Sequence, residues 1–121
     1  KTMLLFKSFG FKYGLPPEAD FVFDIRCLKN PHYDRKLRGL TGKEKPVIEF
    51  LDGDSDVQKM SNDIKSFMTA WIPRFFEDSR NYLTIAIGCT GGWHRSVYLT
   101  EKLSKHFDKT MLVTTRHREL D

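Results

Sequence analysis

Short apolar runs alternate with turn residues along the chain, and four of these runs predict β-strands. They fall within residues 2–11, 21–25, 82–87 and 111–113. Runs of this length, rich in β-branched and aromatic residues and bounded by Gly, Pro or Asn, are typical of strands that are buried in a sheet. Polar Asp24 and Arg26 lie at the end of the run at 21–25, which suggests functional groups at the carboxyl end of that strand.

A longer apolar pattern predicts the clearest helix, over residues 55–75. Ser55 begins a capping box with Gln58, and Pro73 predicts a kink or an early end of the helix. The apolar side chains recur at three- and four-residue intervals: Val57, Met60, Ile64, Phe67, Met68, Trp71, Ile72 and Phe75. Such a stripe indicates a face that packs into the core, and we expect Trp71 and Met68 to lie there. Two shorter helices are predicted. One lies around residues 47–51, after a capping box at 41–44, and the other extends from Val97 to about Phe107.

The order of these elements favours an α/β fold. Strand, loop, helix and strand follow one another from residue 82 to residue 113, as in a parallel α/β unit. A length of 121 residues suits one domain, and 40% hydrophobic with 30% charged residues excludes disorder and fibrous repeats. We therefore expect a single three-layer-like α/β domain over residues 1–121, with a mainly parallel sheet and a long basic loop at 26–43.

Charge and cysteine content narrow the class of partner. Twenty Lys and Arg against 16 Asp and Glu give a net charge of +4, which permits an anionic partner without requiring one. No apolar run is long enough for a membrane span, so we expect a cytoplasmic protein without a membrane partner.

Cys27 and Cys89 are expected to be free thiols, with Cys27 buried and inert. No metal-ligand spacing occurs in the sequence. Because the chain starts at Lys1, we interpret it as part of a longer protein.

The segment after the strand at 82–87 carries the most specific chemistry. Gly91 and Gly92 allow backbone N–H groups to converge where a helix begins, which is a typical anion site. Four neighbouring side chains can donate hydrogen bonds to a phosphate: Thr90, His94, Arg95 and Ser96. We interpret this loop as a phosphate-binding site.

A phosphatase is the main alternative for the same loop. Residues 89–96 match the CxxGxxR(S/T) signature of cysteine-dependent phosphatases, in which a thiolate attacks phosphorus. Gly88 replaces the usual preceding His of tyrosine phosphatases, and no Asp is placed as the general acid, although Asp24, Asp52 and Asp54 are candidates. A tight turn without a ligand is the third possibility.

Three further positions are candidates with simpler alternatives. His32 follows Pro31 in the basic loop and either reaches a ligand or is solvated. Asp24 either accepts hydrogen bonds from a ligand or pairs with Arg26. Near the C-terminus, a basic group either contacts nucleic-acid backbone or faces solvent: Arg116, His117 and Arg118.

Several motifs together resemble the C-terminal domain of the bacterial RapZ/YvcJ family. The motifs lie at residues 9–14, 23–26, 30–32, 40–42 and 88–97, the last reading GCTGGWHRSV. The resemblance implies an α/β fold similar to part of phosphofructokinase, in a noncatalytic domain that senses glucosamine-6-phosphate. It also implies binding of small regulatory RNA, presentation of that RNA to RNase E, and a homo-oligomeric parent protein.

The same resemblance implies a ligand pocket and a missing cofactor domain. The implied pocket residues are Asp24, His32, Cys89, Thr90, Gly91, Gly92, His94, Arg95 and Ser96. Full-length members carry an N-terminal P-loop domain that binds ATP or GTP. No GxxxxGK(S/T) motif occurs in this sequence, so we expect no nucleotide cofactor in this domain.

Overall fold

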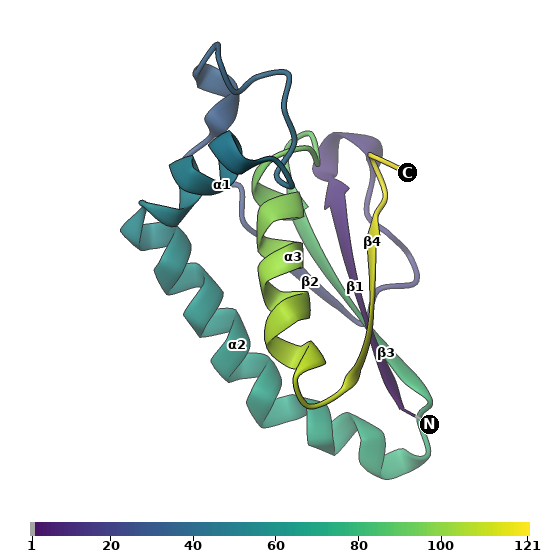
Figure 1. The fold of residues 1–121 in the computed structure, drawn as a ribbon. Helices are drawn as coiled ribbons and strands as arrows, with labels where there is room; N and C mark the ends of the chain where they lie inside the picture. The colour runs from purple at the N-terminus through teal and green to yellow at the C-terminus, as the bar shows by residue number, and fades with distance from the viewer. Residues whose placement is uncertain (1) are drawn as a thin grey trace.

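A parallel sheet forms the centre of the domain in the computed structural model, which describes residues 2–121 (Figure 1). Within those residues, the sheet has the strand order β2-β3-β1-β4, and every neighbouring pair is parallel. The bounds are β1 (Met3–Gly10), β2 (Phe21–Asp24), β3 (Tyr82–Cys89) and β4 (Leu112–His117). The four predicted strands are therefore confirmed. Because the strands are parallel, all their carboxyl ends meet at one edge of the sheet.

The helices also follow the predicted pattern, with two shifted caps: the first helix begins after Glu44 and not after Thr41, and the second is capped one residue earlier than predicted. They are α1 (Lys45–Asp52), α2 (Ser55–Phe75) and α3 (Arg95–Asp108). The carboxylate of Asp54, one residue before the predicted cap, accepts the Val57 N–H at 3.1 Å and begins α2. Pro73 lies inside this helix, which continues two residues further to Phe75.

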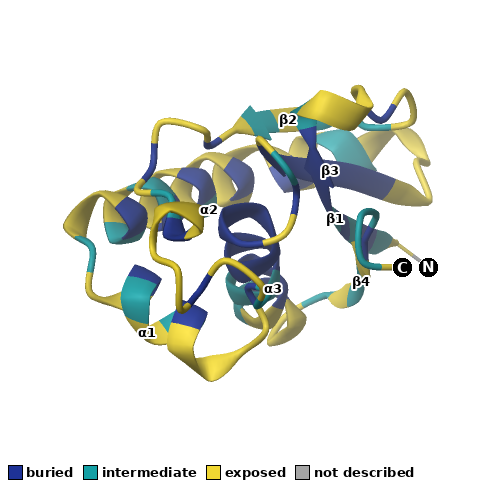
Figure 2. Ribbon diagram, turned by 90° about the horizontal axis from the view of Figure 1, so that it is seen from above, coloured by how far each residue is buried: buried dark blue, intermediate teal, exposed yellow. Residues whose placement is uncertain are grey.

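The helices cover one face of the sheet, and coil crosses the other (Figures 1 and 2). On the helical face, the ring of Phe6 in β1 stacks on Phe107 of α3 with centroids 5.7 Å apart. On the opposite face, Lys7 forms an ion pair with Glu18 of the segment that joins β1 to β2. The sheet thus lies between a layer of helices and a thin layer of coil, and β3 is buried along all but its first residue.

Two predictions about burial are wrong. Trp71 and Phe67 are 46% and 42% exposed, although both lie on the apolar stripe of α2. Phe67 reaches β2, where its ring forms T-shaped contacts with Phe21 and Phe23. However, β2 is the last strand of the sheet, and within residues 2–121 nothing beyond it covers the helix. Cys27 follows the short strand β2 and is exposed, whereas Met68 is fully buried as expected.

Residues 2–121 contain no helix with the length and apolar character needed to cross a bilayer.

Candidate functional site

An open cleft of about 550 Å³ lies at the carboxyl ends of the strands. Three segments form its walls: the β3–α3 loop, the turn after β1 and the loop around residues 30–38. Its cationic side chains are Lys12, Arg38 and Arg95, joined by His32 and His94. No Asp or Glu lines the cleft within the described chain, and no group of three or more His, Cys, Asp or Glu there is placed to hold a metal ion. The cleft therefore favours an anion.

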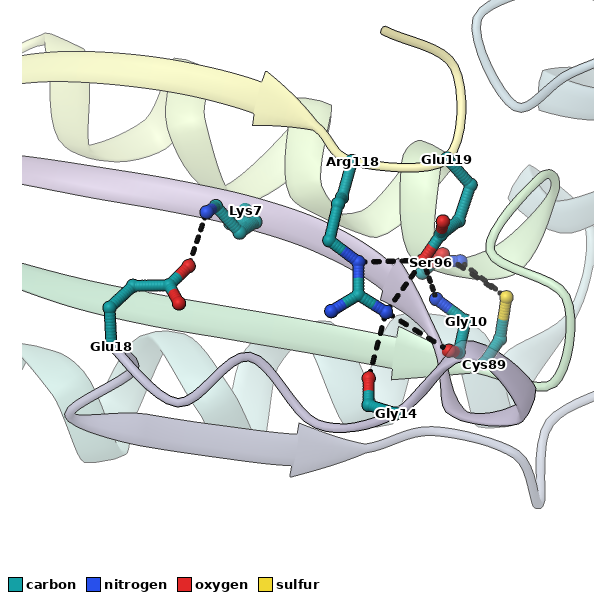
Figure 3. Close-up of polar contacts among 8 residues, drawn as sticks. All are labelled: Lys7, Gly10, Gly14, Glu18, Cys89, Ser96, Arg118 and Glu119. Atoms are coloured by element: carbon teal, nitrogen blue, oxygen red, sulfur yellow. Dashed lines mark hydrogen bonds and ion pairs between the residues drawn. The ribbon is translucent and has the colours of Figure 1, made fainter.

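Cys89 at the end of β3 is joined to the first turn of α3 (Figure 3). Its Sγ atom donates a hydrogen bond to the Oγ of Ser96 at 3.1 Å, and the Ser96 N–H donates to Sγ at 3.4 Å. Cys89 borders the cleft but is only 2% exposed, and Ser96 is completely buried. This arrangement fixes the strand-to-helix turn, and the thiol has to leave Ser96 before it can attack a substrate.

Arg95 is buried and contacts the backbone beyond β2. Its Nη1 donates to the carbonyl oxygens of Arg26 at 2.8 Å and Leu28 at 2.9 Å, and Nη2 lies 3.5 Å from Thr90 Oγ1. The Nε atom is buried and has no hydrogen-bond partner within residues 2–121. Arg95 thus connects α3 to the loop after β2, and part of its guanidinium remains available to an anion.

The β3–α3 loop, at Gly91 and Gly92, packs directly against the end of β1. Gly92 has a φ of +78°, and a Cβ there would lie 2.6 Å from the Gly10 nitrogen and 2.5 Å from Glu119 Cγ. A Cβ on Gly10 would lie 2.5 Å from the Gly91 carbonyl carbon. Any side chain at these positions would push the loop away from the strand, since the approach leaves no room. Gly91 itself has open space around it.

Arg118 and Glu119, which follow β4, hold the turn after β1 in place (Figure 3). Glu119 Oε2 accepts the Gly10 N–H at 2.9 Å and pairs with Arg118 at 2.8 Å. Arg118 Nη2 donates to the carbonyl oxygen of Gly14 at 2.7 Å. The segment between Gly10 and Gly14 carries Lys12 into the cleft, so these two residues position that wall. The sequence contains no local signal for this role.

The two cleft histidines differ in their surroundings. His94 precedes α3 and is 7% exposed, and its Nε2 lies 3.1 Å from the carbonyl oxygen of Leu37. Burial lowers the pKa of His94 below the ordinary 6.5, so the ring is neutral at pH 7 and donates to that carbonyl. His32 is exposed at the mouth of the cleft, and the Asn30 side chain fixes its backbone by accepting the His32 N–H at 3.1 Å.

Asp24 does not line the cleft. Its carboxylate forms an ion pair with Arg26 at 2.6 Å, which was the simpler of its two predicted roles. Hydrogen bonding from Arg26 holds the pKa of this carboxyl below its usual value. The structure instead brings Lys12 and Arg38 into the cleft, two cations that the sequence analysis did not identify.

The predicted C-terminal basic group does not form one surface. His117 is 5% exposed, and its ring lies between Ser8 Oγ, 2.7 Å from Nδ1, and Glu101 Oε2, 2.6 Å from Nε2. Alternation along β4 sends Arg116 to the opposite, exposed side, and Arg118 is used in the contacts described above. Burial between β1 and α3 therefore removes His117 from any nucleic-acid surface.

Comparison with known proteins gives a consistent family match. The model described as "RapZ C-terminal domain" matches residues 2–121. The chain is 59% identical over 115 residues to a nucleotide-binding protein of Aromatoleum aromaticum, covering 95% of this chain and 39% of that protein. It is 56% identical over 122 residues to a nucleotide-binding protein of Methylobacillus flagellatus, covering 100% of this chain and 44% of the relative. The chain thus spans about two fifths of these curated relatives.

Proposed function

The chain belongs to the RapZ C-terminal domain family, a family of regulatory domains, and we propose that it binds a phosphorylated amino sugar without cleaving it. The observation that carries the proposal is the cleft at the carboxyl ends of the strands, with three cationic side chains and no carboxylate in its lining. Ligand sites of open α/β sheets occur at this edge. Glucosamine-6-phosphate is the ligand that the resemblance implies.

The phosphate is best accommodated next to the β3–α3 loop. Thr90 and Gly91 line the cleft where α3 begins, and this helix end carries partial positive charge. Lys12 is exposed on the neighbouring turn after β1, where its backbone N–H donates to the Thr90 carbonyl oxygen at 3.2 Å, and its side chain can approach the phosphate. The unpaired Nε of Arg95 offers a buried donor. His32 at the mouth is placed to contact the sugar hydroxyl or amino groups.

The environment of Cys89 supports binding without hydrolysis. A phosphatase cysteine needs an accessible thiolate, whereas this Sγ is buried and donates to Ser96. The lining also contains no carboxylic acid to protonate a leaving group. Cys89 is therefore assigned to holding the turn.

The adapter role extends this proposal to partners. By family resemblance, the domain binds a small regulatory RNA, presents it to RNase E and works within a homo-oligomeric cytoplasmic protein. The net charge of +4 permits an RNA partner. In this scheme the sugar phosphate regulates the binding of the RNA.

Phosphorus NMR of glucosamine-6-phosphate titrated with the domain tests the ligand directly. We expect the phosphate resonance to shift or broaden while no inorganic phosphate appears over hours. Lys12→Met removes one cleft cation that makes no side-chain hydrogen bond or ion pair within residues 2–121, and should weaken binding about tenfold or more. Lys109→Met removes the same charge at the far end of α3 and should bind like the wild type.

Three other outcomes would contradict the proposal. Release of inorganic phosphate that disappears in Cys89→Ser would establish the cysteine-dependent phosphomonoesterase instead. An unchanged resonance at millimolar ligand would reject the sugar phosphate. Equal weakening in the Lys12 and Lys109 variants would show that the domain attracts anions through its overall charge and not through the cleft.

A further inference from the structure

Positive charge is concentrated in one short loop beside the cleft. Residues 29–38 contain Lys29, Arg35, Lys36 and Arg38 against a single carboxylate, Asp34, which gives the loop a net charge of +3. The whole chain has a net charge of +4, so ten residues carry most of the excess. All four cations are exposed. A local charge excess of this kind attracts a polyanion.

An uncovered aromatic ring lies in the middle of this loop. Tyr33 is 81% exposed, the most of any large hydrophobic side chain in the part of the chain that the structure describes. The backbone beneath it is held by the Asn30 cap and by the Asp34 N–H, which donates to the Pro31 carbonyl at 3.0 Å. The ring is therefore presented by a fixed turn at little cost in backbone entropy.

A shallow hollow of about 670 Å³ adjoins Tyr33 on the side away from the cleft. Lys29, Arg35 and Lys36 line it, and Lys29 Nζ lies 4.4 Å from the centre of the Phe50 ring. Asn30 and Tyr33 border both this hollow and the cleft. A surface that interleaves aromatic rings with cations suits nucleic acid, because bases stack on the rings while phosphates meet the cations.

We propose that residues 29–38 form a binding surface for single-stranded RNA, with one base stacked on Tyr33 and the backbone phosphates held by Lys29, Arg35 and Lys36. The proposal rests on the RNA-binding role proposed above, but places it beside the cleft and away from Arg116 and Arg118. RNA is favoured because its bases can stack on the exposed ring while its evenly spaced phosphates meet the neighbouring cations.

The same loop offers a route between RNA and the sugar phosphate. His32 lines the cleft, and its ring meets that of Tyr33 edge-on, with centroids 6.0 Å apart and an interplanar angle of 82°. A ligand that reorients His32 therefore alters the platform on which the base stacks. By thermodynamic linkage, RNA and sugar phosphate must then change each other's affinity by the same factor.

Fluorescence anisotropy with a labelled RNA of about 12 nucleotides tests the surface, since sites of this type span several nucleotides. Tyr33→Ala should weaken binding about tenfold, whereas Tyr33→Phe keeps the stacking ring and should restore it. Tyr82→Ala is the matched control, because Tyr82 is 57% exposed at the amino end of β3, away from the cleft. Circular dichroism establishes that each variant is folded.

The phosphate contacts are tested by salt dependence. Replacing Arg35 and Lys36 together by Gln removes two cations, and should lower the slope of log affinity against log salt by about 1.4. Replacing Lys105 and Lys109 by Gln removes the same charge from exposed positions at the end of α3 and should leave the slope nearly unchanged.

The outcomes separate this proposal from the proposed function. RNA binding that survives the loop variants but is lost in Arg116→Gln would place the RNA site on β4 and overturn the inference. If polyglutamate competes as well as unlabelled RNA does, the partner of this surface is an acidic protein and not RNA. Failure of the RNA to bind at all would reject both the surface and the adapter role, while the phosphorus NMR titration judges the sugar phosphate independently.

Discussion

Replacing Arg95 with Ala should destabilise the domain as well as remove a cleft cation. Two charge-assisted hydrogen bonds from Nη1 would be lost, and the carbonyl oxygens of Arg26 and Leu28 would lose a partner in a largely buried place. Such bonds contribute about 1.5–3 kcal/mol each, so the free energy of unfolding should fall by about 3–6 kcal/mol. Since a domain of this size is stable by about 5–15 kcal/mol, this loss is a large share of the total.

Urea denaturation followed by circular dichroism measures this loss as a lower midpoint with little change in slope. Arg95→Lys keeps the positive charge but can replace only some of the guanidinium hydrogen bonds. Its urea midpoint should therefore lie between those of the wild type and Arg95→Ala. Lys12→Met is the matched control, because it should weaken binding of the sugar phosphate and leave the urea midpoint unchanged. A free energy of unfolding of Arg95→Ala within about 0.5 kcal/mol of the wild type would refute the structural role assigned to Arg95.

Three further predictions follow from the same region. Gly92→Ala should cost on the order of 1–3 kcal/mol or more, read as a lower melting temperature, because its φ of +78° and its close contacts leave no room for a methyl group. Because burial lowers the pKa of His94 below 6.5, the unfolded chain takes up this proton more readily, and the free energy of unfolding should fall from about pH 7 to about pH 5; His94→Asn should flatten that fall, and an unchanged slope would contradict it. Ellman's reagent should modify exposed Cys27 rapidly and buried Cys89 only after unfolding, and fast modification of both thiols in the folded protein would be inconsistent with the site.

Local patterns were sufficient to predict the strands and helices. Strand and helix periodicity depends on near neighbours in the chain, as do the capping residues of α2. The errors arose where burial depends on distant segments. The stripe of α2 is apolar at Phe67 and Trp71, but the sheet beneath ends at β2, and no pattern within the helix reports where a sheet ends.

The sequence by itself determined that a glycine-rich turn joins a buried strand to a helix, because the glycines, the strand and the helix are contiguous. It also identified Cys89 and Arg95 as important, but not what they contact. The tertiary structure decided that Cys89 bonds Ser96, that Arg95 holds carbonyls 67 and 69 residues away, and that Lys12 and Arg38 enter the same cleft. Those contacts depend on the strand order β2-β3-β1-β4, which brings together loops that are far apart in the chain. Strand order is set by the packing of the whole sheet against the helices, and no single segment encodes it.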